Sequence, residues 1–140
     1  MRIIILGKGY VGTNLFNELN EKYNVSIFAK SELDYTDRWN FIMELTNTYD
    51  EETYVINCSG FTGRPNVDEG EHRKEECWKY NVVVPLELNK ACKETGAEII
   101  HITSGCIYSG YQKEWDENDT PNFGIYSDDA SFYSKSKHAF

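Results

Sequence analysis

The chain has 140 residues, of which 40% are hydrophobic and 14% aromatic, and its 14 Lys and Arg against 23 Asp and Glu give a formal net charge of −9. These figures fit one folded domain and argue against an intrinsically disordered chain. The negative charge argues against nucleic-acid binding, which depends on clustered Lys and Arg. No apolar stretch approaches the roughly 20 residues of a membrane span. The opening MRIIILGKG does not read as a signal peptide, so we expect a cytoplasmic protein with no membrane partner.

The cysteines show no C-x-x-C spacing of the kind that indicates a zinc site or a redox pair. We therefore expect no bound metal and reduced thiols, most of which fill the core. The four cysteines are Cys58, Cys77, Cys92 and Cys106, of which Cys106 is considered again below.

From its amino terminus the chain alternates short β-branched runs with segments of helical period, a pattern typical of βαβ units around a parallel sheet. Apolar runs predict strands at Arg2–Leu6, Val25–Phe28 and Thr53–Asn57. A helix is predicted between the first two strands, at Val11–Lys22. The residues that fall on one face of it are Val11, Leu15, Phe16 and Leu19.

A second helix is predicted at about 37–49, with hydrophobic residues at every third to fourth position: Trp39, Ile42, Met43 and Leu45. The later segment VVVPLELNKACKETG predicts a helix with Pro85 in or near its first turn or at a kink, and with Gly96 as its cap. The segment Ala97–Ser104 predicts the last strand. The carboxylate-rich stretch 111–129 is expected to be an exposed loop, and SFYSKSKHAF is typical of a helix start.

No internal repeat or low-complexity linker divides the chain, so we predict one dinucleotide-binding domain over residues 1–140. The predicted fold class is α/β, a Rossmann-type doubly wound parallel sheet of about five strands. Right-handed crossovers favour the strand order 3-2-1-4-5. Ligands of such sheets bind at the carboxyl ends of the strands.

The string Gly7-Lys8-Gly9-Tyr10-Val11-Gly12 matches the pattern G-x-G-x-x-G between a predicted strand and a predicted helix. In that position the backbone can approach a pyrophosphate closely, and the unpaired N–H groups at the helix start attract its charge. The string therefore indicates dinucleotide binding. The alternative is a tight turn without a ligand.

The end of the second strand bears on the choice of nicotinamide cofactor. Enzymes that use NAD usually place Asp or Glu there, about 20 residues beyond the glycines, against a ribose hydroxyl. Here the segment reads FAKS, and Lys30 and Ser31 would suit the 2′-phosphate of NADPH. We therefore expect NADPH, with NADH as the alternative. A solvated loop lysine would explain Lys30 equally well.

Tyr133 and Lys137 are spaced to lie on one face of a helix. A phenol titrates at about pH 10, so a Tyr that exchanges protons near neutrality needs a nearby cation, which Lys137 would supply. Ser104, at the expected end of the last strand, would hydrogen-bond a substrate carbonyl that Tyr133 protonates. Because Tyr and Lys are common in this chain, the spacing alone establishes nothing, and Ser104 would also suit the cap of a turn.

Three blocks of sequence resemble the extended short-chain dehydrogenases/reductases that act on nucleotide sugars. They are GFTGRPNVDEGEHRKEE with YNVVVPLELNKAC, then HITSGCIYSG, then ENDTPNF with SFYSKSK. Within that group the chain is most similar to the bifunctional UDP-4-keto-6-deoxy-glucose 3,5-epimerase/4-reductases of UDP-rhamnose synthesis. It resembles dTDP-4-dehydrorhamnose reductases and GDP-fucose synthases more distantly. The resemblance runs through the whole chain.

The resemblance implies a role for several residues. It makes Ser104, Tyr133 and Lys137 the catalytic triad, with Asn81 in support and Lys137 also binding the nicotinamide ribose. Residues assigned to the cofactor are Asp34 and Tyr35 near the adenine, and Cys58, Ser59 and Gly60 at a strand end. Residues assigned to the sugar side are Thr62, Arg64 and Asn66, together with Ser104 and Cys106.

Cys106 stands where epimerising members of the family carry a cysteine that exchanges protons at the sugar ring. A thiol suits that step, because carbons beside a keto group are acidic enough for a base of moderate pKa. The alternative is a small thiol packed after the strand. The chain departs from the family in two details: its glycine string is one residue shorter, and Cys58-Ser59 replaces an alanine-rich strand end.

The resemblance implies an NADPH-dependent reductase of a nucleotide-linked 4-keto-6-deoxy sugar with linked 3,5-epimerisation, giving UDP-L-rhamnose or a similar sugar. It also implies a homodimer, and a chain that represents the cofactor half without the substrate subdomain, with activity of this half alone impaired or absent. Two alternatives stay open. One is a non-catalytic dinucleotide-binding domain, and the other is a related epimerase or dehydratase, although Gly105 replaces the carboxylate that would suggest a dehydratase.

Overall fold

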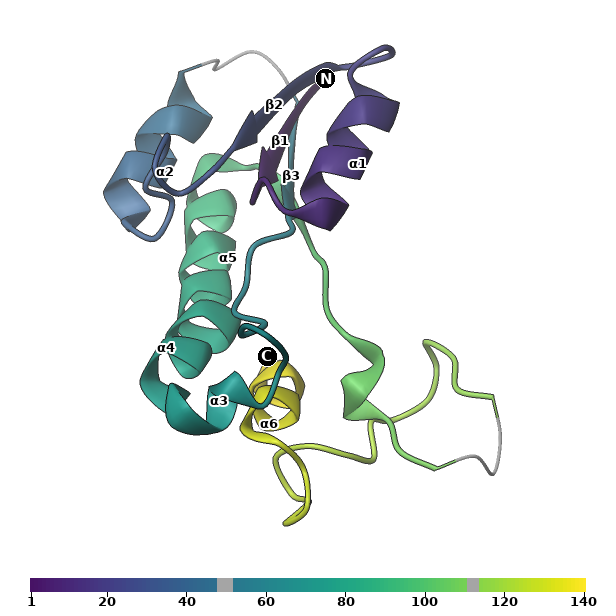
Figure 1. Ribbon diagram of the computed structural model, residues 1–140. Coiled ribbons are helices and arrows are strands. Elements are labelled where there is room, and N and C mark those ends of the chain that lie inside the picture. Colours follow the sequence, from purple (N-terminus) through teal and green to yellow (C-terminus); the bar gives the residue numbers. More distant parts are fainter. Residues whose placement is uncertain (48–51, 111–113) are drawn as a thin grey trace. The chain divides into compact units, whose positions relative to one another are not determined.

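The computed structural model describes residues 1–47, 52–110 and 114–140 (Figure 1). They form two compact units: Met1–Ser59 with Val84–Ile102, and Gly60–Val83 with Thr103–Phe140. The assignment of a single domain to residues 1–140 stays a prediction. No helix in the described ranges is long and apolar enough to cross a membrane.

The first unit is built on a parallel sheet with the order β2-β1-β3-β4. Its strands are β1 (Arg2–Leu6), β2 (Asn24–Phe28), β3 (Thr53–Asn57) and β4 (Glu98–His101). Every residue of the central strand β1 is buried, as expected of a parallel strand covered on both faces. This arrangement confirms the predicted Rossmann-type α/β class.

The described sheet has four strands, not about five. Its order is the predicted 3-2-1-4-5 without the outer strand 3, so that strands 4 and 5 become β3 and β4. The segment after β2 reads AKSELDYTD and forms turns instead of a strand, with the Asp34 carboxylate accepting hydrogen bonds from the Thr36 N–H and hydroxyl. The last strand ends at His101 and not at Ser104, because its partner β3 ends at Asn57.

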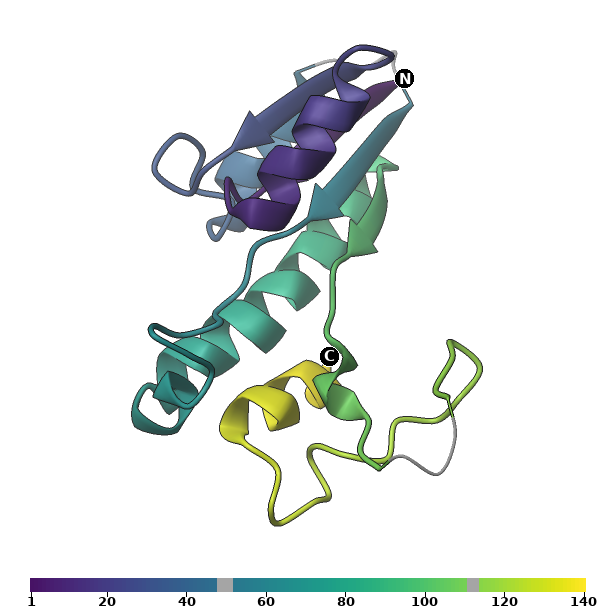
Figure 2. The same ribbon diagram turned by 45° about the vertical axis from the view of Figure 1, so that its right-hand side comes forward.

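Helices cover both faces of this sheet. Helix α1 (Tyr10–Leu19) lies on one face, and α2 (Arg38–Thr46) and α5 (Val84–Thr95) lie on the other (Figure 2). Pro85 is the second residue of α5, as predicted for a first turn. Gly96 follows the helix with a φ of +76°, the left-handed conformation that terminates helices and favours glycine.

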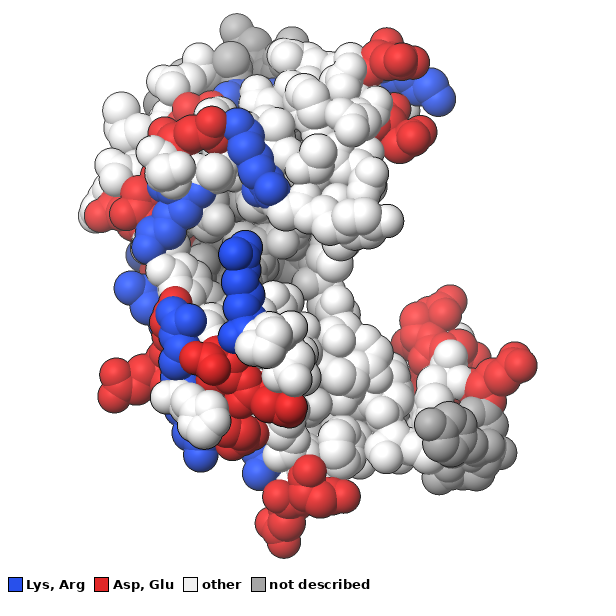
Figure 3. Space-filling model, in the orientation of Figure 1, with Lys and Arg blue, Asp and Glu red and all other residues white. Residues whose placement is uncertain are grey.

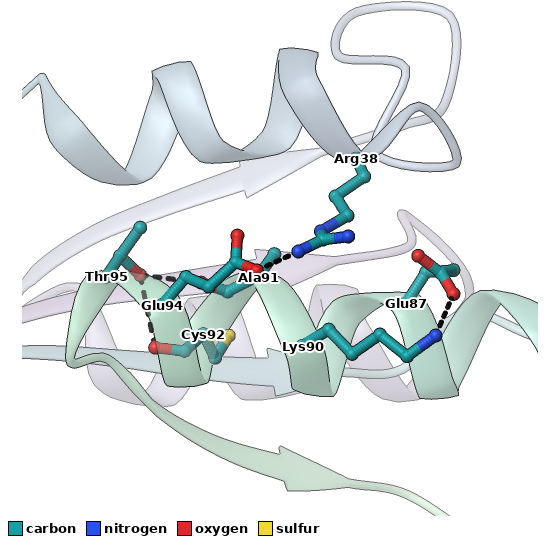
Figure 4. A network of polar contacts seen from close by, with 7 residues as sticks. All are labelled: Arg38, Glu87, Lys90, Ala91, Cys92, Glu94 and Thr95. Carbon is teal, nitrogen blue, oxygen red and sulfur yellow. Dashed lines mark hydrogen bonds and ion pairs between the residues drawn. The ribbon is translucent and has the colours of Figure 1, made fainter.

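The apolar residues whose spacing predicted α2 do not all face the core. Phe41 and Leu45 are the buried residues of this helix, whereas Trp39 is 74% and Met43 62% exposed. Helix α2 carries apolar residues on more than one face, and its packing against α5 selects the face of Phe41. An ion pair between Arg38 of α2 and Glu94 of α5 joins the two helices (Figure 4).

The second unit contains short helices around a small core of Phe61, Cys77 and Tyr133. They are α3 (Glu69–His72), α4 (Lys74–Trp78), the π-helical turn η1 (Lys79–Val83), the 3₁₀ turn η2 (Gly105–Ile107) and α6 (Phe132–Ala139). The first N–H groups of α6 donate to the Ser131 hydroxyl and to the carboxylate of Glu71 on α3. These two acceptors fix where α6 begins.

The loop that follows η2 is acidic and largely exposed, as predicted. The sequence places Glu114, Asp116, Glu117 and Asp119 in this loop. Figure 3 shows the Asp and Glu side chains in red on its surface. Its base is held by Asn122, whose side chain exchanges two hydrogen bonds with the backbone of Ser109. Residues 111–113 of the predicted loop lie outside the described ranges.

Replacing Phe41, which is fully buried, by Ala should lower the free energy of unfolding by about 3–5 kcal/mol through lost contacts and a cavity. Trp39→Ala, a truncation of an exposed ring on the same helix, should change it by less than about 0.5 kcal/mol. Urea denaturation followed by circular dichroism measures both values. Equal losses would contradict the packing of α2.

Candidate functional site

The glycine string forms a turn between β1 and α1 in which there is no room for side chains at two positions. Gly7 has a φ of +102°, and a Cβ there would lie 3.0 Å from the backbone nitrogen of Ser59. A Cβ on Gly12 would lie 2.0 Å from the carbonyl oxygen of Gly7. Glycine is therefore required at both positions, because β1, α1 and the end of β3 meet there.

Gly9 has the opposite surroundings. A Cβ built there would meet nothing within 4 Å, and Gly9 is the N-cap of α1, with no side chain to cap the first turn. The flanking residues Lys8, Tyr10 and Val11 are exposed. The turn thus presents open space in front of helical N–H groups and the positive end of the helix dipole, an arrangement that binds phosphate.

A carboxylate stands at the end of β2, where sequence reasoning had found only Lys30 and Ser31. Glu32 accepts hydrogen bonds from the Ala29 N–H at 2.8 Å and from the Lys8 ammonium at 2.6 Å. The hydrogen bond from Lys8, followed by that from Ala29, lowers the pKa of Glu32. Glu32 follows Gly12 by 20 residues, so its position in the sequence could have revealed it.

The remaining predicted adenine and ribose residues differ in exposure. Lys30 and Ser31 are exposed on the turn after β2. Asp34 is exposed on the following turn, whereas the side chain of Tyr35 is only 6% exposed. A ligand at this edge would therefore meet Lys30, Ser31 and Asp34 more readily than the Tyr35 ring.

The end of β3 lies against the glycine turn within the same unit. The Cys58 N–H donates to the Leu6 carbonyl at 2.9 Å, and Ser59 packs on Gly7 as described above. Burial raises the pKa of the Cys58 thiol, so Cys58 is not an activated nucleophile. The first unit thus gathers the predicted phosphate residues and the strand end Cys58-Ser59 in one place.

Asn81 organises the second unit. Its side chain is 2% exposed, accepts a hydrogen bond from the Phe61 N–H at 2.8 Å, and donates to the Phe61 carbonyl at 3.0 Å and to the Ser136 hydroxyl at 3.0 Å. It lies on the π-helical turn η1, an irregularity that is frequent at functional sites. The amide of Asn81 therefore joins the segment after Gly60 to helix α6.

Ser136 is a member of this cluster that sequence reasoning missed, and it lies beside Cys77, one of the thiols expected to be reduced. Ser136 is fully buried, and its hydroxyl donates to the Tyr133 carbonyl at 2.7 Å while accepting from Asn81. The Cys77 sulfur lies 3.5 Å from the Ser136 oxygen. The hydroxyl thus lies on α6 between the two predicted catalytic residues, where only the pairing with Asn81 reveals its role.

Tyr133, Lys137, Ser104 and Cys106 all belong to the second unit. Ser104 is a hydrogen-bonding neighbour that lowers the pKa of the Tyr133 hydroxyl, and the Lys137 ammonium lies 5.9 Å from the centroid of the Tyr133 ring. The Ser104 oxygen also accepts the Cys106 N–H at 3.3 Å, so it caps η2 as well. Cys106 packs beside the Phe61, Cys77 and Tyr133 core. A Cβ on Gly60 would lie 3.4 Å from the Lys137 nitrogen.

The two pKa shifts at this site share one cause. Burial raises the pKa of Tyr133, and the hydrogen bond with Ser104 opposes the increase. Burial also lowers the pKa of Lys137, against the pull of the Cys106 and Cys77 thiols. A raised pKa keeps the phenol protonated at neutral pH, the form that a proton donor to a carbonyl oxygen requires. The sequence predicted that Lys137 would lower the phenol pKa, but burial raises it and only Ser104 lowers it.

The predicted sugar-side residues lie on the turn between Phe61 and α3. Thr62, Arg64 and Asn66 are exposed there, and the Asn66 side chain accepts the Asp68 N–H at 3.0 Å. All four cysteines are free, and Cys77 and Cys92 are buried, consistent with core thiols. Each unit therefore holds its own group of predicted site residues. The glycine turn lies in the first unit, and the Tyr133 cluster and the turn that carries Arg64 lie in the second.

The model of the RmlD substrate-binding domain family matches residues 1–139. A trifunctional UDP-glucose 4,6-dehydratase/UDP-4-keto-6-deoxy-D-glucose 3,5-epimerase/UDP-4-keto-L-rhamnose-reductase of Arabidopsis thaliana is 33% identical over 98% of this chain and 20% of its own length. A bifunctional dTDP-4-dehydrorhamnose 3,5-epimerase/dTDP-4-dehydrorhamnose reductase of the same plant is 34% identical over 96% of this chain and 44% of its own length. The chain thus spans less than half the length of these curated relatives.

Among solved structures, a dTDP-4-dehydrorhamnose reductase of Clostridium acetobutylicum superposes with a TM-score of 0.80 and 27% sequence identity. The superposition covers 99% of this chain and 47% of the other. The relatives and this structure are all similar to the described chain over nearly its whole length.

Proposed function

The chain belongs to the RmlD substrate-binding domain family, and we propose that it carries the cofactor-binding and catalytic segment of an NADPH-dependent reductase of nucleotide-linked 4-keto-6-deoxy sugars. The observation that carries the proposal is the buried residue Tyr133, with Ser104 beside its hydroxyl and the Lys137 ammonium beside its ring. The names of the relatives above support the substrate class, a UDP- or dTDP-linked sugar. UDP-L-rhamnose or a similar deoxysugar is the proposed product.

The proposed cofactor site uses the open turn at Gly9. Its N–H groups and the start of α1 would hold the pyrophosphate, and Lys30 with Ser31 would hold the 2′-phosphate. When bound, NADPH supplies a hydride to the C4 carbonyl carbon. Lys137 would bind the nicotinamide ribose hydroxyls, and its ammonium, lying near the Tyr133 ring, would favour the phenolate that forms after proton transfer.

The proton steps fall to residues of the second unit. Ser104 would donate a hydrogen bond to the carbonyl oxygen, and Tyr133 would transfer its proton to the same oxygen as the alcohol forms. Burial suits this direction, because it raises the phenol pKa and so keeps Tyr133 protonated before the reaction. Asn81 would hold α6, and with it Tyr133, through Ser136.

We also propose that Cys106 exchanges the protons at C3 and C5 before reduction. Its position two residues after Ser104 would bring the thiol to the same sugar ring, and the keto group acidifies both carbons. The Cys106 thiolate would take the proton from the carbon to leave an enolate, and a second acid on the opposite face of the ring would return a proton, so the oxidation state of the sugar stays unchanged. Reduction at C4 would then trap the epimerised product.

In a full-length context, Tyr133→Phe should lower the rate of 4-keto reduction by about 10²–10⁴-fold, because the proton donor is lost while the ring is kept. NADPH affinity should stay within about twofold of the wild type. Tyr126→Phe makes the same change on a side chain that is 90% exposed and should leave the rate unaltered. The assay follows NADPH oxidation with UDP-4-keto-6-deoxy-glucose, and a fully active Tyr133→Phe would refute the proton-donor role.

Lys30→Ala should weaken NADPH binding about tenfold and NADH binding less than about twofold, because only NADPH carries the 2′-phosphate. Glu32→Gln should weaken NADH instead, since a carboxylate at this position suits the free ribose hydroxyls. Titration by nicotinamide fluorescence gives all the dissociation constants. Equal losses for both nucleotides in either variant would exclude that residue from the ribose site.

In a full-length context, Cys106→Ser should stop the uptake of solvent deuterium at C3 or C5, because a hydroxyl is too weakly acidic to replace the thiolate base. Tyr133→Phe should retain this exchange, so the two variants separate epimerisation from reduction. Mass spectrometry of the recovered nucleotide sugar measures the exchange. Unchanged uptake in Cys106→Ser would make Cys106 a packing residue.

A further inference from the structure

Three polar side chains of the first unit form a chain from α5 through β4 to the end of β3. The Asn89 oxygen lies 3.0 Å from the Nε2 of His101, and the Nδ1 of His101 lies 3.0 Å from the Asn57 amide nitrogen. Asn57 is only 2% exposed and pairs directly with His101 in the sheet register. The proposed reaction makes no use of these three hydrogen-bonded side chains.

The backbone of Ser59 fixes the orientation of the Asn57 amide. The Asn57 oxygen accepts the Ser59 N–H at 3.0 Å and the Ser59 hydroxyl at 2.5 Å. Since a backbone N–H only donates, the oxygen must face Ser59, and the amide nitrogen must face His101. The Nδ1 of His101 therefore accepts, and its Nε2–H donates to Asn89. This arrangement exists only with a neutral imidazole.

Protonation of His101 would place an N–H of the ring against an N–H of Asn57. The repulsion between two donors is relieved when the Asn57 amide turns over and offers its oxygen to His101. This rotation of the amide would take the acceptor oxygen away from the Ser59 N–H and the Ser59 hydroxyl. The N–H is a backbone group beside a buried side chain, so its lost hydrogen bond is costly. Ser59 packs on Gly7, where a Cβ would lie 3.0 Å from its nitrogen, so its position is coupled to the glycine turn.

We infer that His101 is a positioning residue for the dinucleotide-binding turn, which acts through Asn57 and Ser59 and only in its neutral form. The inference rests on the proposed function, because it assumes that the turn binds the cofactor. His101 touches neither substrate nor cofactor in this account. Its hydrogen bond holds Asn57 in the orientation that fixes Ser59 over Gly7.

Several of the charged and titratable groups on the elements packed around His101 are paired with one another. On α5, Glu87 pairs with Lys90 and Glu94 with Arg38 (Figure 4), and burial raises the pKa of Cys92 to about 12. On β3, Tyr54 donates to Glu52. The other groups on these elements are Lys93 of α5, Glu98 of β4 and, just after β3, Cys58. The two ring nitrogens of His101 themselves face the uncharged amides of Asn57 and Asn89.

The test compares His101→Asn, His101→Leu and the wild type. Asn keeps an acceptor for Asn57 but does not titrate, whereas Leu removes the acceptor. His72→Asn, at an exposed position of the second unit, is the matched control for loss of a histidine. Calorimetric titration with NADP⁺ at pH 8.0 and at pH 5.5 brackets the usual imidazole pKa of about 6.5. The 2′-phosphate titrates at about pH 6 in every variant, so its effect cancels in the ratio of variant to wild type.

Acidification should weaken NADP⁺ binding to the wild type and to His72→Asn more than to His101→Asn, because only the first two keep an imidazole at position 101 that can gain a proton. His101→Leu should bind weakly at both pH values. Without cofactor, acidification should lower the protection of the Ser59 amide against hydrogen exchange in the wild type and in His72→Asn more than in His101→Asn. In His101→Leu this protection should be low at both pH values.

Two results overturn the inference. One is an identical pH dependence in the wild type and His101→Asn, and the other is wild-type affinity with full Ser59 protection in His101→Leu. A folded wild type that binds no NADP⁺ at pH 8.0 contradicts the proposed function instead. Ser59 protection then decides by itself whether His101 fixes the strand end.

Discussion

The close approach of β1, α1 and the end of β3 is the constraint on which the first unit depends. Gly7 and Gly12 have no space for a Cβ, since Ser59 and the Gly7 carbonyl occupy it. This packing is possible because parallel strands end at the same edge of the sheet, so that Leu6 and Asn57 stand side by side in register. The same packing leaves Gly9 open at the start of α1, where an anion can approach the helix. Tight glycines thus hold the turn, and the open glycine gives it a binding surface.

The second unit depends on a buried amide. Asn81 makes hydrogen bonds with the Phe61 backbone and with the Ser136 hydroxyl, and the Ser136 hydroxyl in turn donates to the Tyr133 carbonyl. A buried amide with its partners in place rigidifies its surroundings, because each lost bond would leave a polar group unsatisfied. The hydroxyl of Tyr133 meets Ser104 from a helix that is held in this way. The proposed proton transfer relies on this rigidity and on the burial that keeps the phenol protonated.

Features that depend on neighbouring residues could be predicted from the sequence. The run Arg2–Leu6, the glycine string and the helix stop at Gly96 each carry their signal within a few residues, and the structure confirms all three. The buried face of α2 could not be chosen, because packing on α5 decides between Phe41 and Trp39. Glu32 was visible in the spacing but was overlooked beside Lys30. The contacts of Ser136 and His101 join residues far apart in the chain, so no local pattern could reveal them.

The central claim is that this chain binds NADPH at the turn around Gly9. An NMR titration of the backbone amides with NADPH tests it without any sugar substrate. The account predicts saturable shifts at residues 7–12, 30–35 and 58–60, with the largest changes at Gly9 and Tyr10. A folded spectrum that does not change, or shifts that avoid the glycine turn, would contradict it.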